Sequence, residues 1–307
     1  MTCPSTTDVV RRFGSVTLAD DLPLTPMPLA QIPEQRSTGQ DTITFRLLGG
    51  LGFCPNGSPV EIRGTIQRTL LATLLTVGSH PVPMGALVEE LWGEHPPATA
   101  ENALQAHISR LRRKLQGVAG AGSVRLVGLP SGYRLLVPAE DVDALLFLRT
   151  LGEVRGRQAT DADDGAIVRL RAALALWFGP VFGGLVGGPI CQAAVARFEA
   201  ARSVAAETLF DLELRQGRHT EIIPELSGLV ESQALNERFC EQLMVALYRS
   251  GRQIEALDAY RRMRLRLDTE LGVAPSPTLR TYERAILAHD PALRIGADHA
   301  ALRGEAA

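Results

Sequence analysis

One segment, residues 99–116 (TAENALQAHISRLRRKLQ), limits the possible folds of this chain more than any other. Its aliphatic residues recur at intervals of four, three and four, at Leu104, Ile108, Leu111 and Leu115. This spacing predicts a helix with one stripe that must be buried. The opposite face and its margins carry small, amide or guanidinium side chains: Asn102, Gln105, Ala106, Ser109 and Arg113. Such groups can pair with purine edges in the DNA major groove, but an ordinary solvated helix shows the same pattern, so the flanking sequence must decide.

The flanking sequence predicts a compact α+β unit around this helix. Three short apolar runs precede it, broken by glycine and proline, at residues 44–48, 51–53 and 59–62, and they indicate a small antiparallel meander. Two amphipathic helices follow, at about 66–75 and 83–92. Thr99 is the expected N-cap of the third helix. Residues 124–137 then predict a β-hairpin around the turn 129–132. A sheet, three helices and a hairpin in this order form a winged helix-turn-helix.

This segment resembles the output domain of OmpR/PhoB-type response regulators, whose third helix carries a run similar to HISRLRRKL at 107–115. The longer run GALVEELWGEHPPATAENALQAHISRLRRKL at 85–115, followed by SGYRL in the hairpin, is similar to the SARP family (Streptomyces antibiotic regulatory proteins). Several separate motifs match in order at the correct spacing. The resemblance implies an OmpR/PhoB-type winged-helix DNA-binding domain over residues 44–138.

Beyond Ala139 the apolar periodicity predicts helices throughout. They are expected near residues 141–156, 164–178, 190–216, 219–231, 236–250, 252–270 and 276–289. Gly217-Arg218-His219 and Gly251-Arg252-Gln253 lie 34 residues apart in similar contexts, which indicates helix-turn-helix repeats of tetratricopeptide type. Ala256 and Tyr260 hold the spacing of that repeat's packing positions, but Asp268 stands where its proline is expected, so the repeat is degenerate.

The helical half also resembles the bacterial transcriptional activation domain that follows the DNA-binding domain in SARPs. The resemblance rests on ALALW at 173–177, on Gly179-Pro180 and on LYRSGR at 247–252. Residues 181–188, with four glycines, depart from the family pattern. We expect a looser loop there to leave DNA binding undisturbed. The departure from the family pattern puts the partner contacts of this loop in doubt.

The predicted fold is therefore mainly α, a winged helix-turn-helix (α+β) followed by an all-α tetratricopeptide-like domain. The domains are expected at 44–138 and 139–290. Residues 1–43, rich in Pro, Thr, Ser and Asp, and residues 291–307 are expected to be disordered tails. Alternatively, the translation start has been placed too far upstream, and Met27 is an internal candidate for the true start.

Within the winged-helix frame, four side chains are predicted to face the groove: Asn102, Gln105, Ser109 and Arg113. Arg110 and Arg112 lie toward the flanks, where contact with phosphate is favoured over base reading. Arg134, just after the hairpin turn, can enter a narrow minor groove. Three further candidates for phosphate contact could equally be solvated: Gln67, Arg68 and Arg125. His107, Trp177 and Tyr248 are predicted to pack structurally, and the arginines at 261–266 to form a solvated face.

Charge and motifs narrow the class of protein. Residues 44–138 carry nine basic and five acidic side chains, whereas residues 139–307 carry 20 and 24, so the front half suits a polyanion better. The four cysteines are far apart and read as reduced thiols, without spacing for a metal or a disulfide framework. No GxxxxGK[ST], GxSxG, HExxH or GxGxxG occurs, and the carboxylates are dispersed, mostly on predicted exposed helix faces. We therefore expect no enzyme and no cofactor.

No apolar run approaches the ~20 residues that cross a bilayer, so a soluble, cytoplasmic, nucleoid-associated protein without membrane partners is expected. The favoured function is a sequence-specific transcriptional activator bound to double-stranded promoter DNA. The resemblance implies tandem self-association on direct repeats near the −35 region, recruitment of RNA polymerase holoenzyme through the sigma factor and other subunits, and control of clustered antibiotic genes. The alternative is a protein-interaction adaptor whose winged helix does not read specific DNA. A helical half that binds a small-molecule effector is a third possibility, which no sequence feature favours.

Overall fold

The computed structural model describes residues 43–55, 60–78, 80–117, 124–156 and 163–293. The chain opens with an antiparallel sheet of β1 (Ile43–Arg46), β2 (Gly52–Pro55) and β3 (Val60–Glu61), in that order. Ile43 is buried and pairs with Pro55, so the first domain begins one residue before the predicted boundary. The other residues of the two predicted tails, 1–42 and 294–307, lie outside the described residues.

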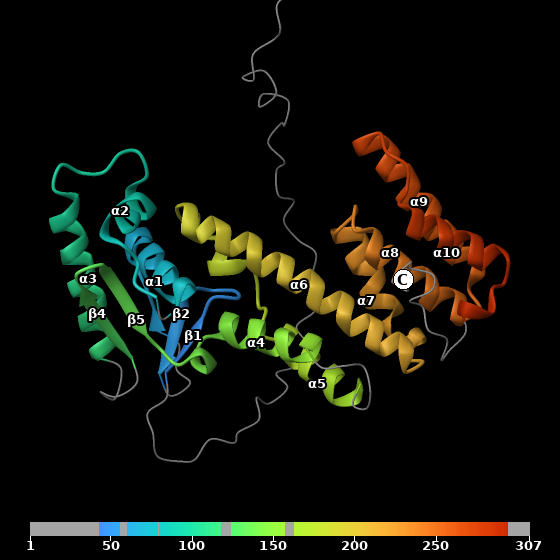
Figure 1. Ribbon diagram of the computed structural model, residues 1–307, viewed down its shortest axis with the longest axis horizontal. Helices are drawn as coiled ribbons and strands as arrows, with labels where there is room; N and C mark the ends of the chain where they lie inside the picture. The colour runs from blue at the N-terminus through green and yellow to red at the C-terminus, as the bar shows by residue number, and fades with distance from the viewer. Residues whose placement is uncertain (1–42, 56–59, 79, 118–123, 157–162, 294–307) are drawn as a thin grey trace, which may run out of the picture. The chain divides into compact units, whose positions relative to one another are not determined.

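Three helices and a hairpin follow the sheet, as the sequence predicted (Figure 1). They are α1 (Thr65–Val77), α2 (Met84–Trp92), α3 (Ala100–Gln116), β4 (Arg125–Leu129) and β5 (Gly132–Leu136). β4 and β5 pair antiparallel, and Val82, which precedes α2, exchanges two backbone hydrogen bonds with Tyr133 at 2.8 and 3.0 Å. Thr99 stands at the N-cap of α3 as predicted, but its side chain makes no capping hydrogen bond. The winged helix-turn-helix prediction is confirmed.

The rest of the described chain is helical, which confirms the predicted fold class (Figure 1). Its α-helices are α4 (Asp143–Gly156), α5 (Asp163–Leu174), α6 (Pro189–Arg215), α7 (His219–Ser232), α8 (Glu237–Arg249), α9 (Gln253–Leu271) and α10 (Pro277–Leu287). Three short 3₁₀ turns accompany them: η3 (Ala139–Asp141), η4 (Val181–Gly184) and η5 (Pro291–Leu293). Leu293 is buried and its carbonyl accepts a hydrogen bond from Arg249, so the ordered fold extends past the predicted end at 290.

α5 ends at Leu174, four residues earlier than the sequence predicted. The cause is a tertiary contact: the N–H groups of Phe178 and Phe182 donate to the carbonyls of Leu48 and Leu47, just after β1. A helix continued through this segment would turn these N–H groups back onto its own preceding turn. The loop after α5 therefore belongs to the contact with the sheet.

The buried side chains of the described residues form two clusters. The first runs from Ile43 to Leu212 and joins the winged helix to α4, α5 and α6. The second runs from Ala206 to Leu293 and holds α7 to α10 together. Trp177 is buried in the first cluster as predicted. Tyr248, predicted to be core, is only half-buried beside the second cluster, and its hydroxyl contacts His289.

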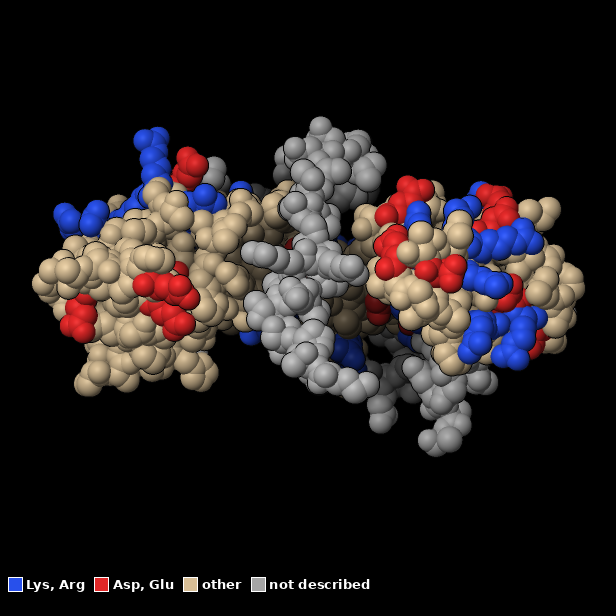
Figure 2. Space-filling model, turned by 90° about the horizontal axis from the view of Figure 1, so that it is seen from above, with Lys and Arg blue, Asp and Glu red and all other residues tan. Residues whose placement is uncertain are grey.

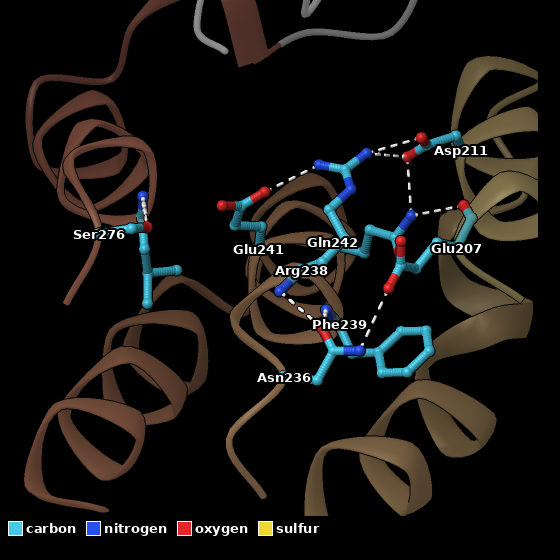
Figure 3. A network of polar contacts seen from close by, with 9 residues as sticks. Glu207, Asp211, Asn236, Arg238, Phe239, Glu241, Gln242 and Ser276 are labelled. Atoms are coloured by element: carbon cyan, nitrogen blue, oxygen red, sulfur yellow. Dashed lines mark hydrogen bonds and ion pairs between the residues drawn. The ribbon is translucent and has the colours of Figure 1, made fainter. Parts of the chain in front are cut away.

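A polar network joins α6 to α8 beside the second cluster (Figure 3). Arg238 donates to Asp211 at 2.6 Å and to Glu241 at 2.8 Å, and Gln242 donates to the Glu207 carbonyl at 2.7 Å. Four carboxylates in the described chain are buried, as exceptions to the prediction that most lie on exposed helix faces: Glu90, Asp141, Glu213 and Glu241. A buried carboxylate needs hydrogen-bond donors around it, and for Glu90 and Glu213 these come from Ile190, Cys191 and Arg171, residues distant in the sequence that periodicity does not pair.

Candidate nucleic-acid interface

The buried stripe of α3 fixes which face of that helix is open. Leu104, Ile108, Leu111 and Leu115 are all at most 2% exposed. The opposite face is exposed, with the four predicted groove-facing residues on it: Asn102, Gln105, Ser109 and Arg113. Arg110 is exposed too, with its Nε on the Ala106 carbonyl one turn earlier. The structure thus brings amide, hydroxyl and guanidinium groups together on one accessible helix face.

Two other cations of α3 hold the domain together. Arg112 is half-buried and its Nε donates to the Leu126 carbonyl of β4 at 3.1 Å. Lys114 donates from Nζ to the Glu61 carbonyl of β3 at 2.9 Å. These bonds tie the helix to the hairpin on one side and to the sheet on the other. The sequence placed Arg112 among the phosphate contacts and gave Lys114 no role.

Gln67 and His107 form an internal link between α1 and α3. The Gln67 side-chain amide donates to His107 Nδ1 at 2.9 Å and to the His107 carbonyl at 3.1 Å. The His107 ring also meets Trp92 edge-on, with centroids 6.2 Å apart. Burial, and then the charge of Arg110, lower the pKa of His107, which favours the neutral ring with Nδ1 as acceptor. His107 is structural, as predicted, and Gln67 is its partner.

Arg68 points to the helical half of the chain. Its guanidinium donates to the Phe182 carbonyl of η4 at 3.1 Å. The hairpin holds the two remaining candidates: Arg125, at the start of β4, is exposed, whereas Arg134, on β5, is half-buried opposite Val127. Of the candidates beyond α3, Arg125 is therefore the most accessible to a phosphate.

The hairpin is held to the rest of the domain by a close backbone approach at Gly132. A Cβ atom at this position would lie 2.0 Å from the Val82 carbonyl oxygen, and the backbone has φ +134°. Only glycine combines this conformation with this contact. The position of the hairpin relative to the rest of the domain is therefore fixed at this contact.

The charge distribution separates the two halves. Figure 2 shows Lys and Arg side chains gathered along one margin of the winged-helix half, at left, while both signs alternate over the helical half, at right. Among the described residues no cluster of His, Cys, Asp and Glu could hold a metal ion, and no helix is long and apolar enough to cross a membrane. The three described cysteines, Cys54, Cys191 and Cys240, are free and buried. Burial raises the pKa of Cys191 and Cys240 to about 12, so both are thiols.

Both halves of the chain match known protein families. Residues 60–135 match the family model "Transcriptional regulatory protein, C terminal", and residues 142–287 match the "Bacterial transcriptional activator domain". The chain is 40% identical over 257 residues to the transcriptional regulator RedD of Streptomyces coelicolor, covering 82% of this chain and 73% of RedD. It is 36% identical to the regulatory protein DnrI of Streptomyces peucetius, covering 81% of this chain and 93% of DnrI.

The larger regulatory protein AfsR of Streptomyces coelicolor is 37% identical, but the chain covers only 27% of its length. Among solved structures, Mycobacterium tuberculosis EmbR in complex with a low affinity phosphopeptide has a TM-score of 0.75 and 32% identity. That match covers 82% of this chain and 66% of the EmbR chain.

A winged helix with an exposed face on α3, followed by an activator domain, defines a two-domain bacterial transcriptional regulator of the OmpR/PhoB type. Similarity to RedD and DnrI over most of their length is more specific. The chain belongs to the SARP family of transcriptional activators.

Proposed function

We propose that this regulator reads specific promoter DNA with α3 and the hairpin. The observation that carries the proposal is the exposed face of α3 above its fully buried aliphatic stripe. Asn102 and Gln105 carry the amide chemistry that pairs with adenine, and Arg113 the chemistry that pairs with guanine. Ser109 can serve either base. Arg110 and Arg125 supply phosphate contacts, and Arg134 enters the minor groove beside the wing.

Three of the predicted contact residues take a different role in this proposal. Arg112, Gln67 and Arg68 position the reading helix and its domain through the carbonyls and ring that they contact. They act on DNA only through the residues they hold.

Activation is assigned to the helical half. We propose that copies of the chain bind in tandem on direct repeats near the −35 region and recruit RNA polymerase holoenzyme through its sigma factor and other subunits. Membership of the SARP family supports a target among clustered antibiotic biosynthetic genes. Stepwise mobility shifts on one and two repeats test the tandem arrangement, and in-vitro transcription with purified holoenzyme tests recruitment.

Binding to the promoter of a neighbouring gene, measured by fluorescence anisotropy across a salt series, tests the DNA reading. Arg113→Ala should weaken operator binding about 5- to 150-fold, an energy of ~1–3 kcal/mol, and relax preference at one base pair. Arg125→Ala should weaken all sequences alike and lower the salt slope by about 1. Arg264→Ala removes the same charge from the exposed surface of α9 and serves as control.

The alternative function, an adaptor that binds proteins without reading DNA, makes the opposite prediction. Equal affinity for the promoter and for scrambled DNA, together with an unchanged preference in Arg113→Ala, would exclude specific reading and leave the adaptor.

A further inference from the structure

Glu90 lies on α2, the helix before the reading helix, yet it is bonded to the other half of the chain. It is 4% exposed, and its carboxylate accepts hydrogen bonds from the backbone N–H of Ile190 at 2.7 Å and of Cys191 at 3.0 Å. These two N–H groups belong to the first turn of α6, which begins at Pro189.

The first turn of a helix has N–H groups without internal partners and carries the positive end of the helix dipole. The N-cap residue of α6 is Gly188, which has no side chain to offer. Glu90 therefore supplies, from 100 residues away in the sequence, the acceptor and the negative charge that α6 lacks.

Two glycines make this approach possible. A Cβ atom at Gly188 would lie 2.6 Å from the Glu90 Cα and 2.8 Å from its carbonyl oxygen. A Cβ atom at Gly187 would lie 2.5 Å from the Cys191 Cβ and 3.3 Å from Glu90 Oε1. Both residues belong to segment 181–188, which was expected to leave DNA binding undisturbed. That segment packs directly against the helix-turn-helix.

Two further contacts join the same two halves of the chain. Arg68 of α1 donates to the Phe182 carbonyl of η4, and Asp143 of α4 accepts the N–H groups of Leu47 and Leu48 after β1. The sheet, α1 and α2 are each joined to a different element of the helical half. The shared first core cluster fills the space between these links.

We propose that Glu90 is a positioning residue for DNA reading. Seating the α6 N-terminus on Glu90 fixes α2 and, through the α2–α3 packing, the orientation of the reading face. The body that reads DNA then extends from β1 into α6, and the helical half contributes to specificity without touching a base. This inference rests on the proposed DNA reading.

The test uses full-length Glu90→Gln and Gly188→Ala, which disturb the same contact from opposite sides. The glutamine side chain keeps one oxygen, which can accept from one of the two backbone N–H groups. Its NH₂ group then faces the other N–H group, so that two donors meet. Operator and scrambled-DNA affinities are measured at a temperature where circular dichroism shows each variant folded. We expect the operator affinity to fall about 5- to 100-fold, the loss of one or two base contacts, with scrambled-DNA affinity and salt slope unchanged.

Asp211→Asn is the matched control, because it weakens the α6–α8 network without touching Glu90. It should lower stability and leave the ratio of operator to scrambled affinity unchanged. Wild-type protein gives an independent readout: operator, but not scrambled DNA, should slow amide hydrogen exchange in the peptide containing Ile190 and Cys191, since coupling is reciprocal.

If wild type discriminates operator from scrambled DNA but both variants keep the wild-type ratio, the role of Glu90 is overturned. The same holds if operator binding leaves the exchange at Ile190 and Cys191 unchanged. If wild type does not discriminate at all, the proposed DNA reading fails first, and the inference fails with it.

Discussion

Asp143 allows a quantitative test of the contact between the first strand and the helical half. Its carboxyl oxygens accept the N–H groups of Leu47 at 2.8 and 3.0 Å, of Leu48 at 3.1 Å and of Ala144 at 2.7 Å. Burial raises the pKa of Asp143 to about 6, and these hydrogen bonds and the charge of Arg46 offset only part of that effect.

The sign of the pH dependence follows from this raised pKa. In the unfolded chain Asp143 has the ordinary pKa of about 3.9, so between about pH 4 and 6 the native state binds more protons. The stability contributed by Asp143 is therefore fully present below about pH 4 and is lost as pH rises through 6. A shift of about two units, at 1.36 kcal/mol per unit, corresponds to roughly 2–3 kcal/mol.

The assay compares urea unfolding of wild type and Asp143→Asn from pH 4 to 8. Other titrating groups cancel in the difference between the two proteins. We expect wild type to lose roughly 2–3 kcal/mol relative to the variant between pH 4 and 7, and nothing further above pH 7. Asp258→Asn, which breaks a surface pair with Arg261, is the matched control for the loss of one carboxylate. A constant difference for Asp143→Asn, or one that grows in favour of wild type with pH, would refute the reasoning.

Three further predictions concern the stability of the winged helix and of the α6–α8 network. Gly132→Ala should cost about 2–4 kcal/mol in thermal unfolding, because its Cβ collides with the Val82 carbonyl and breaks the backbone pairing there. Gly128→Ala, whose Cβ would lie 3.5 Å from the nearest atom of the Tyr133 ring, should cost much less. Leu111→Ala, inside the first core cluster, should cost about 2–5 kcal/mol in urea unfolding; a loss below 1 kcal/mol would contradict the helix phase. Arg238→Gln should cost about 2–4 kcal/mol in urea unfolding, because it removes the cation between Asp211 and Glu241. Arg252→Gln, at an exposed pair, should cost much less in the same assay.

Local pattern was enough to predict most elements of this fold. The 4-3-4 spacing in α3 admits only one buried stripe, and the structure buries those four residues. Gly217, Gly251 and Gly272 were predicted at helix ends, and each follows a helix with a positive φ. In these cases the determining interaction lies within about one helical turn of the residue, so the sequence alone carries it.

Contacts across long sequence separations could not be predicted in the same way. Glu90 bonds to residues 100 and 101 positions away, and Arg68 to a carbonyl 114 positions away. One signal was present at Glu90: it lies three residues after the buried Leu87 and so shares the buried side of α2. A carboxylate on a buried face requires donors, but the sequence does not say which backbone supplies them.

The basic run RLRRK at 110–114 shows why a charge pattern does not translate directly into DNA contacts. Four cations stand within five residues, yet Arg112 and Lys114 bind carbonyls of β4 and β3 while Arg110 and Arg113 stay on the exposed side. Each phosphate neutralised adds about 0.9 to the salt slope, so α3, with Arg110 proposed on a phosphate and Arg113 on a base, should contribute about 1 rather than about 4. The difference is structural: half of the run holds the helix between sheet and wing. Specificity can then rest on few side chains, because their backbone is held from both sides.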